Sequence, residues 1–158
     1  MIAAVSRSVL RSRAVESRFR ADAARRVLLI RLHALGDVAL VLPAAPNVAG
    51  KTTAGEAFAV LLHAAVIVSE DSGLMHMAWA AGVPVVALLG STRSDWSAPQ
   101  GDRAACLDSA DLGCGCCVEP ACRFGDVHCL RRRAPNGVLD SALALLARIH
   151  TQSLEQHS

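Results

Sequence analysis

The stretch "AAVIVSEDSGLMHMAWAAGVPVVALLG", residues 64–90, contains two short apolar runs with a helix-like segment between them. The first run, residues 64–69, is rich in Val and Ile, which is typical of a buried strand. Residues 71–82 follow as a predicted helix with a glycine at its end, and Pro84 opens the second strand. This strand–helix–strand order predicts a right-handed crossover between two parallel strands.

Segments on both sides of this unit continue the alternation of strands and helices. The predicted strands are 27–32 and 104–109, and the predicted helices are 37–42, 53–63 and 136–149. Thr53 and Glu56 have the spacing of a capping box at the start of a helix. Strands that alternate with helices predict an α/β fold with a Rossmann-like parallel sheet.

The composition is that of a globular protein. The chain has 158 residues, of which 53% are hydrophobic and 19% charged, and this is enough for one domain with its own core. Aromatic residues make up only 3%, so we expect a core of Ala, Val and Leu. The longest nearly apolar run, residues 57–68, is shorter than the roughly 20 residues that a membrane-spanning helix needs.

The positive charge is concentrated at the N-terminus. Residues 1–26 contain seven arginines against Glu16 and Asp22, whereas the rest of the chain carries a net negative charge. Such a segment could be a targeting signal or an arm that contacts anionic lipid or nucleic acid. Its arginines do not fall on one helical stripe, so we favour a solvated helix or tail, and nucleic-acid binding is not favoured.

The corner between the first strand of the quoted stretch and its helix has the features of an anion site. Ligands of open parallel sheets lie beyond the carboxyl ends of the strands. We expect Asp71 to be the N-cap of a helix that begins near Ser72, and Gly73 to let an anion approach the backbone. The other N–H groups of the first turn would point outward, and His76 lies one turn from Ser72 on the same face. An ordinary helix cap and a half-buried histidine remain the alternatives.

Two further polar residues are candidates for the same chemistry. The run "AGKTT", residues 49–53, is not a P-loop, because Ala45 stands where the motif requires glycine. Lys51 could still contact a phosphate. Asp37 follows Gly36 beyond the carboxyl end of the first strand, where a carboxylate is either a general base or the N-cap of a short helix.

A cysteine cluster follows the last predicted strand. Cys114, Cys117, Cys122 and Cys129 have the spacing C-x2-C-x4-C-x6-C, with Cys106 and Cys116 as extras. Four thiolates within such a span could hold zinc or an iron–sulfur cluster, with free thiols as the alternative. No secretory signal is recognisable, so we expect a reducing compartment and no disulfides.

Three segments resemble one known family. The runs "VLLIRLHALGDVALVLPA" (27–44), the segment from "GKTT" to "SAPQG" (50–101) and "CGCCVEPACRFGDVHCL" (114–130) resemble glycosyltransferase family 9. These enzymes are the ADP-heptose:lipopolysaccharide heptosyltransferases. The most specific part of this resemblance is the combination D-S-G-x-x-H, followed by a glycine and "VPVVALLG".

The resemblance implies an inverting enzyme with the two-domain GT-B fold, of which this chain holds mostly the C-terminal, nucleotide-binding half. It implies an ADP-sugar donor, a lipopolysaccharide core precursor as acceptor, and no cofactor for the transfer. Asp37 would be the base. The ADP diphosphate would be held by Asp71, Ser72, Gly73, Leu74 and His76. The family acts in the cytoplasm at the inner face of the inner membrane, which implies peripheral contact with anionic lipid.

The chain departs from the family in its length. Members are about twice as long. Only three residues separate residue 46 from residue 50 in this sequence, whereas family members have most of the acceptor domain between the corresponding positions. We therefore divide it into an Arg-rich extension (1–26), a remnant of the acceptor-side domain with its linker (27–49), the nucleotide-sugar-binding half (50–150) with a Cys-rich loop (106–130), and a tail (151–158). Three hypotheses remain: a glycosyltransferase, a non-catalytic nucleotide-binding remnant, and a Cys-metal module with a basic nucleic-acid-contacting arm.

Overall fold

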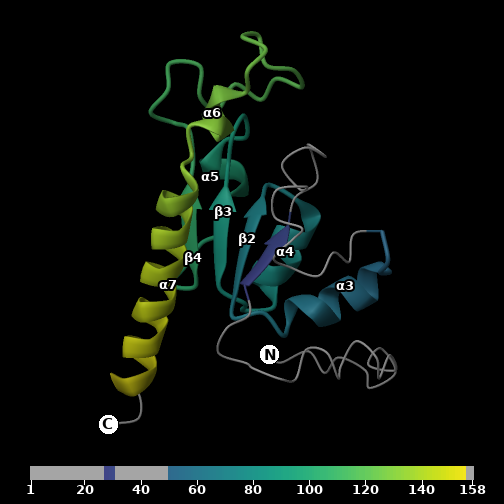
Figure 1. Ribbon diagram of the computed structural model, residues 1–158, viewed down its shortest axis with the longest axis vertical. Helices are drawn as coiled ribbons and strands as arrows, with labels where there is room; N and C mark the ends of the chain where they lie inside the picture. Colours follow the sequence, from purple (N-terminus) through teal and green to yellow (C-terminus); the bar gives the residue numbers. More distant parts are fainter. Residues whose placement is uncertain (1–26, 31–49, 156–158) are drawn as a thin grey trace.

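The fold is built around one parallel β-sheet. A computed structural model describes residues 27–30 and 50–155. The sheet has the order β1-β2-β3-β4, and every neighbouring pair is parallel (Figure 1). The strands are β1 (Val27–Ile30), β2 (Val66–Glu70), β3 (Val85–Leu88) and β4 (Ala104–Leu107). The predicted α/β fold with a parallel sheet is confirmed.

The first predicted strand joins the sheet beside the quoted unit. β1 pairs with β2 in the register Val27 to Val66, and β2 pairs with β3 in the register Ile67 to Val85. All four strands run in the same direction, so their carboxyl ends lie at one edge of the sheet.

Helices cover both faces of the sheet. They are α3 (Ala54–Leu61), α4 (Gly73–Ala80), α5 (Ser94–Ser97), α6 (His128–Arg131) and α7 (Pro135–Glu155). Figure 1 shows α7 on one side of the sheet, with α5 and α6 near the carboxyl ends of the strands. The segment between β2 and β3 forms α4, as the strand–helix–strand pattern predicts.

The side chains of alternate residues in β2 and β3 pack into two separate hydrophobic cores, one on each face of the sheet. On one face Ile67 and Val85 pack with α3 and α4, and on the other Val66 and Val86 pack with α7. The remaining buried members of these cores are Leu61, Met75, Ala78, Val83 and Ala87 on the first face, and Val68, Ala142 and Leu145 on the second. This arrangement follows from the period of two in a strand, and it explains why both central strands are almost continuously apolar.

Several helix ends follow the sequence signals. The Thr53 N–H donates to Glu56 Oε2 at 2.8 Å and the Glu56 N–H donates back to Thr53 Oγ1 at 3.3 Å, so the capping box is confirmed. Gly82, with φ of +76°, follows the last residue of α4 and its cap. In contrast, α7 extends beyond the predicted 136–149 at both ends.

None of the helices within residues 27–30 and 50–155 is both long enough and apolar enough to cross a membrane. The longest, α7, places exposed leucines such as Leu139 and Leu143 on its outer side and buries only Ala142 and Leu145 against the sheet. It is therefore an amphipathic helix that covers one sheet face.

Met75 provides a direct test of the α4 core. Its side chain is completely buried between α4 and the sheet, so Met75→Ala should lower the free energy of unfolding by about 2–5 kcal/mol. The matched control is Leu143→Ala, at a side chain that is 55% exposed on α7, with an expected change within about 0.5 kcal/mol. Urea unfolding measures both. Equal losses in the two variants would contradict the burial of α4.

Candidate functional site

The start of α4 lies directly at the carboxyl end of β2. Only Asp71 and Ser72 separate the last strand residue from the first helical residue. Ser72 has extended backbone angles and its Oγ accepts a hydrogen bond from the Met75 N–H at 3.2 Å. The hydroxyl of Ser69, which is 1% exposed, lies 3.2 Å from the same Oγ. The N-cap of α4 is therefore Ser72, held by a buried serine pair.

The prediction that Asp71 caps the helix is wrong. Asp71 Oδ1 accepts a hydrogen bond from Ser97 Oγ at 2.6 Å and lies 3.4 Å from His76 Nε2. Asp and Ser are equally good N-cap residues, so the sequence did not distinguish them. The cap position is buried, and a neutral hydroxyl is much less costly to bury there than a carboxylate.

Ser97 is a site residue that the sequence pattern did not reveal. It belongs to α5, and its Oγ also lies 3.4 Å from His76 Nε2. The Trp79 Nε1–H donates to the Gln100 carbonyl at 2.8 Å, which ties α4 to the segment that follows α5. This contact between segments far apart in sequence brings Asp71, His76 and Ser97 together. No local spacing signals it.

Two backbone donors remain at the amino end of α4. The His76 N–H donates to the Ser72 carbonyl at 3.2 Å, and the Met75 N–H donates to the Ser72 Oγ of the cap. Among the described residues no acceptor faces the N–H groups of Gly73 and Leu74. Gly73 is exposed, and a Cβ built on it meets no atom within 4 Å, so the space on the side-chain side of its Cα is open. The positive end of the helix dipole and two free N–H groups together favour an anion.

The cysteine loop, residues 114–129, packs near the same edge of the sheet. The Val118 N–H donates to the Ser91 carbonyl at 2.9 Å, just after β3. A Cβ on Gly90 would lie 2.8 Å from Leu130 Cγ, so α6 packs closely against the end of β3. Figure 1 shows α5 and α6 in this region.

The structure gathers a different set of metal-binding groups from the predicted four cysteines. Over the described ranges, the group that could hold an ion is Cys122, Asp126 and His128, whose donor atoms all lie within 4.8 Å of one another. Cys114, a second member of the predicted set, has its Sγ 3.2 Å from His128 Nε2. Cys117 and Cys129 are not part of the group. The spacing of thiols alone does not include Asp126 and His128.

The thiols of this region differ in acidity. Backbone N–H groups of Phe124 and Val127 hold the pKa of the Cys122 thiol below its ordinary value. On β4, burial of the sulfur and the nearby Asp108 carboxylate raise the pKa of Cys106 to about 11. The thiolate form, which binds metals, is therefore favoured at Cys122 over Cys106.

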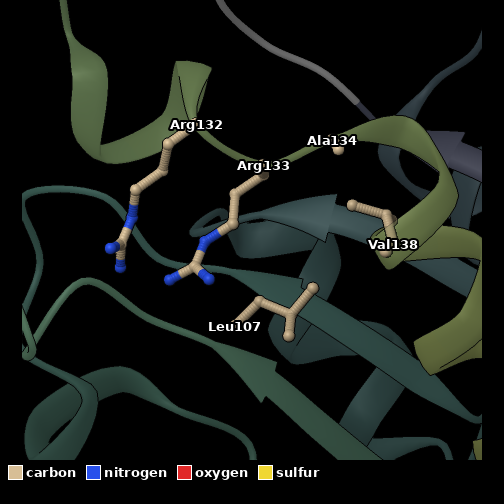
Figure 2. Close-up of a pocket in the computed structure, with 6 residues that line it drawn as sticks. Leu107, Arg132, Arg133, Ala134 and Val138 are labelled. Carbon is tan, nitrogen blue, oxygen red and sulfur yellow. The ribbon is translucent and has the colours of Figure 1, made fainter.

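A separate pocket of about 240 Å³ lies between β4 and the start of α7 (Figure 2). It is lined by Leu107, Arg132, Arg133, Ala134, Gly137 and Val138. The Arg132 guanidinium is paired with the Asp111 carboxylate, whereas Arg133 Nε is buried without a partner in the described structure. The pocket is a second place where an anion could bind, and it belongs to the α7 side of the sheet, away from α4.

Asp37 and Lys51 were also predicted to act at this corner. Asp37 lies outside the described residues. Lys51 is exposed shortly before α3. Their roles stay predictions.

Comparisons with known proteins agree with the sequence resemblance. The sequence profile described as glycosyltransferase family 9 (heptosyltransferase) matches residues 33–128. Lipooligosaccharide heptosyltransferase 2 of Haemophilus influenzae is 41% identical over 58 residues, which are 37% of this chain and 17% of that protein. Lipooligosaccharide heptosyltransferase 2 of Campylobacter jejuni is 28% identical over 104 residues, which are 66% of this chain and 33% of that protein.

A solved structure shares the fold. The glycosyl transferase family 9 protein of Veillonella parvula superposes with a TM-score of 0.67 at 16% identity, over 90% of this chain and 52% of that one. The chain thus spans a third or less of the curated relatives and about half of the solved structure. Since the family profile covers more than half of its residues, this chain belongs to glycosyltransferase family 9, the heptosyltransferase family.

Proposed function

We propose that this chain binds the diphosphate of an ADP-sugar at the amino end of α4. The observation that carries the proposal is the pair of N–H groups at Gly73 and Leu74 that have no acceptor among the described residues, together with the open space around the Gly73 Cα. Two N–H donors at a helix start are matched to the oxygens of a phosphate, and the helix dipole adds a favourable field. The eight residues of α4 provide two turns of aligned peptide dipoles.

His76 would supply a side-chain donor to the same anion. Its ring lies one turn along α4 and its side chain is 42% exposed, so a ligand can reach it. When protonated, the ring forms an ion pair with Asp71. The cationic ring would then face the phosphate from the helix side.

A diphosphate can bind near the Asp71 carboxylate only if Ser97 and His76 compensate its negative charge. An unpaired carboxylate would repel the ligand by Coulomb's law. The Ser97 hydroxyl and the His76 ring both approach Asp71 Oδ1, so its negative charge is partly compensated within the protein. In this proposal Asp71 and Ser97 position His76, and Ser72 positions the backbone.

We further propose that the donor is ADP-heptose and the acceptor an inner-core sugar of lipopolysaccharide or lipooligosaccharide. The relatives are named for lipooligosaccharide, and this supports the acceptor class. The acceptor hydroxyl oxygen would attack the anomeric carbon while its proton passes to Asp37. The bond from that carbon to the phosphate oxygen would break, and its electron pair would leave with ADP. The amino end of α4 would stabilise the charge on the departing diphosphate. The transfer would need no metal or organic cofactor.

A non-catalytic nucleotide-binding protein is the second candidate. The chain spans a third or less of its curated relatives, and this favours a protein that keeps the donor half alone. Family membership favours both candidates over a Cys-metal module that binds nucleic acid. Only the glycosyltransferase proposal includes a location in the cytoplasm at the inner membrane face, with peripheral contact to lipid.

The Gly73→Ala variant tests the diphosphate site. The added methyl group meets no protein atom, so the fold should be unaffected, but it occupies the space in which the anion approaches the backbone. We expect the affinity for ADP to fall at least about tenfold, which equals about 1.4 kcal/mol. Isothermal titration calorimetry of the two proteins measures this difference.

Gly137→Ala is the matched control. Gly137 also belongs to a helix and also has open space around a built Cβ, but it lines the pocket beside Arg133. ADP affinity should be unchanged in this variant. If Gly137→Ala weakened binding and Gly73→Ala did not, the anion would bind in the α7 pocket and the proposal would be wrong.

The Asp37→Asn variant tests catalysis separately from binding. Loss of the general base should reduce heptose transfer by a factor of at least about 100 while ADP affinity is retained. Mass spectrometry of the glycosylated acceptor measures transfer, and Asp140→Asn, at an exposed position on α7, is the control. Transfer that survives in Asp37→Asn would exclude the base role. Absence of transfer in the unaltered protein, with ADP binding intact, would establish the second candidate.

A further inference from the structure

The cysteine loop brings the donor atoms of three different metal-binding groups within 4.8 Å of one another. Asp126 Oδ1 lies 2.8 Å from His128 Nδ1 and 3.8 Å from Cys122 Sγ. The edges of a tetrahedral zinc site with such ligands are roughly 3.3–3.6 Å, as follows from the bond lengths to nitrogen, oxygen and sulfur. Small side-chain movements would therefore bring all three donor atoms to bonding distance.

The backbone holds these groups in place at a conformational cost. Val127 has φ of +51°, which is unusual for a β-branched residue, and it stands between Asp126 and His128. The Gly125 N–H donates to the Cys122 carbonyl at 2.9 Å, so the chain turns back on itself between Cys122 and Asp126. Because of these two turns, Cys122, Asp126 and His128 face the same point although they come from a loop.

The environment of His128 fits a ligand whose coordinating nitrogen is Nδ1. Histidines that bind metals commonly use their second ring nitrogen to donate to an outer partner, which fixes the ring and its tautomer. Here the Cys114 Sγ lies 3.2 Å from His128 Nε2 and can accept that hydrogen bond. The Phe124 ring packs against the imidazole, with 5.3 Å between ring centroids, and limits its rotation.

We propose that Cys122, Asp126 and His128 bind one Zn²⁺ ion, with water in the fourth position and Cys114 as the outer partner of His128. A thiolate and a carboxylate together neutralise the charge of the ion. A mixed set of sulfur, nitrogen and oxygen donors suits zinc better than the hard cations Mg²⁺ and Ca²⁺. The ion would replace the hydrogen bond between Asp126 and His128.

The position of this site gives the ion a structural consequence. The loop is hydrogen-bonded through Val118 to Ser91, which follows β3 at the carboxyl edge of the sheet. An ion that fixes the loop would therefore also fix the segment between β3 and α5. That segment leads to Ser97, the partner of Asp71.

Metal titrations of the reduced, metal-free full chain test the proposal. Co²⁺ reports thiolate binding through its absorption bands, and competition with Zn²⁺ gives the zinc affinity. We expect one ion per chain, and we expect Cys122→Ser, Asp126→Asn and His128→Asn each to weaken binding more than about tenfold. Cys106→Ser and Cys117→Ser are the matched controls, at thiols outside the proposed set, and should bind as the unaltered chain does.

Thiol alkylation of the unaltered chain gives a second measurement that does not depend on the folding of any variant. Peptide mass spectrometry would follow each cysteine with and without Zn²⁺. We expect Zn²⁺ to protect Cys122 strongly and to leave the exposed Cys117 reactive. Equal protection of Cys114, Cys117, Cys122 and Cys129, with binding retained in His128→Asn, would establish a four-thiolate site instead. Absence of Zn²⁺ binding at micromolar concentration would overturn the proposal outright.

Discussion

The hydrogen bond from the Met75 N–H to Ser72 Oγ determines which backbone groups α4 offers to a ligand. Ser69, Ser72 and Met75 are buried where β2 leads into α4, so an N–H that faces the protein there must find an acceptor. Ser72 satisfies Met75 through its side chain and His76 through its carbonyl, while Ser69 holds the Ser72 hydroxyl from below. The N–H groups of Gly73 and Leu74 are left on the open side. The protein's own packing thus separates donors used for folding from donors that a ligand can use.

The sheet brings the other parts of the site to this junction. Parallel strands end at one edge, so the segments after β2 and β3 become neighbours although they are far apart in sequence. Ser97 reaches Asp71 for this reason, and the cysteine loop contacts Ser91 for the same reason. The proposed diphosphate site is therefore assembled from the segments that follow β2 and β3 of this one sheet. Transfer additionally needs an acceptor and a general base, and the proposal assigns the base to Asp37, which lies outside the described residues.

The features that the sequence predicted correctly depend on short-range patterns. Each of these features is determined by residues close together in the sequence. They are the apolar runs of β2 and β3, the capping box at Thr53 and the glycine after α4. The cap of α4 was misassigned because Asp71 and Ser72 are both good caps and only burial distinguishes them. The length of α7 was underestimated because its C-terminal turns are polar and carry no apolar pattern, while Thr151 and Ser153 bond back to the carbonyls of Ala147 and Ile149.

The features that were missed depend on tertiary contacts. The contact of Ser97 with Asp71 joins positions 26 residues apart, and nothing near Ser97 indicates it. In the cysteine loop the relevant signal was present as the spacing C-x3-D-x-H from Cys122 to His128. Thiol spacing alone does not reveal this pattern, because the donors of a mixed site do not repeat.

Amide NMR of the 15N-labelled chain, titrated with ADP and in parallel with adenosine, tests the central claim most directly. If the diphosphate binds at the amino end of α4, the Gly73 and Leu74 amide resonances should shift with ADP, and adenosine should leave them in place. Shifts with ADP at Gly137 and Val138 that leave Gly73 and Leu74 unchanged would place the anion in the α7 pocket. That result would contradict the account.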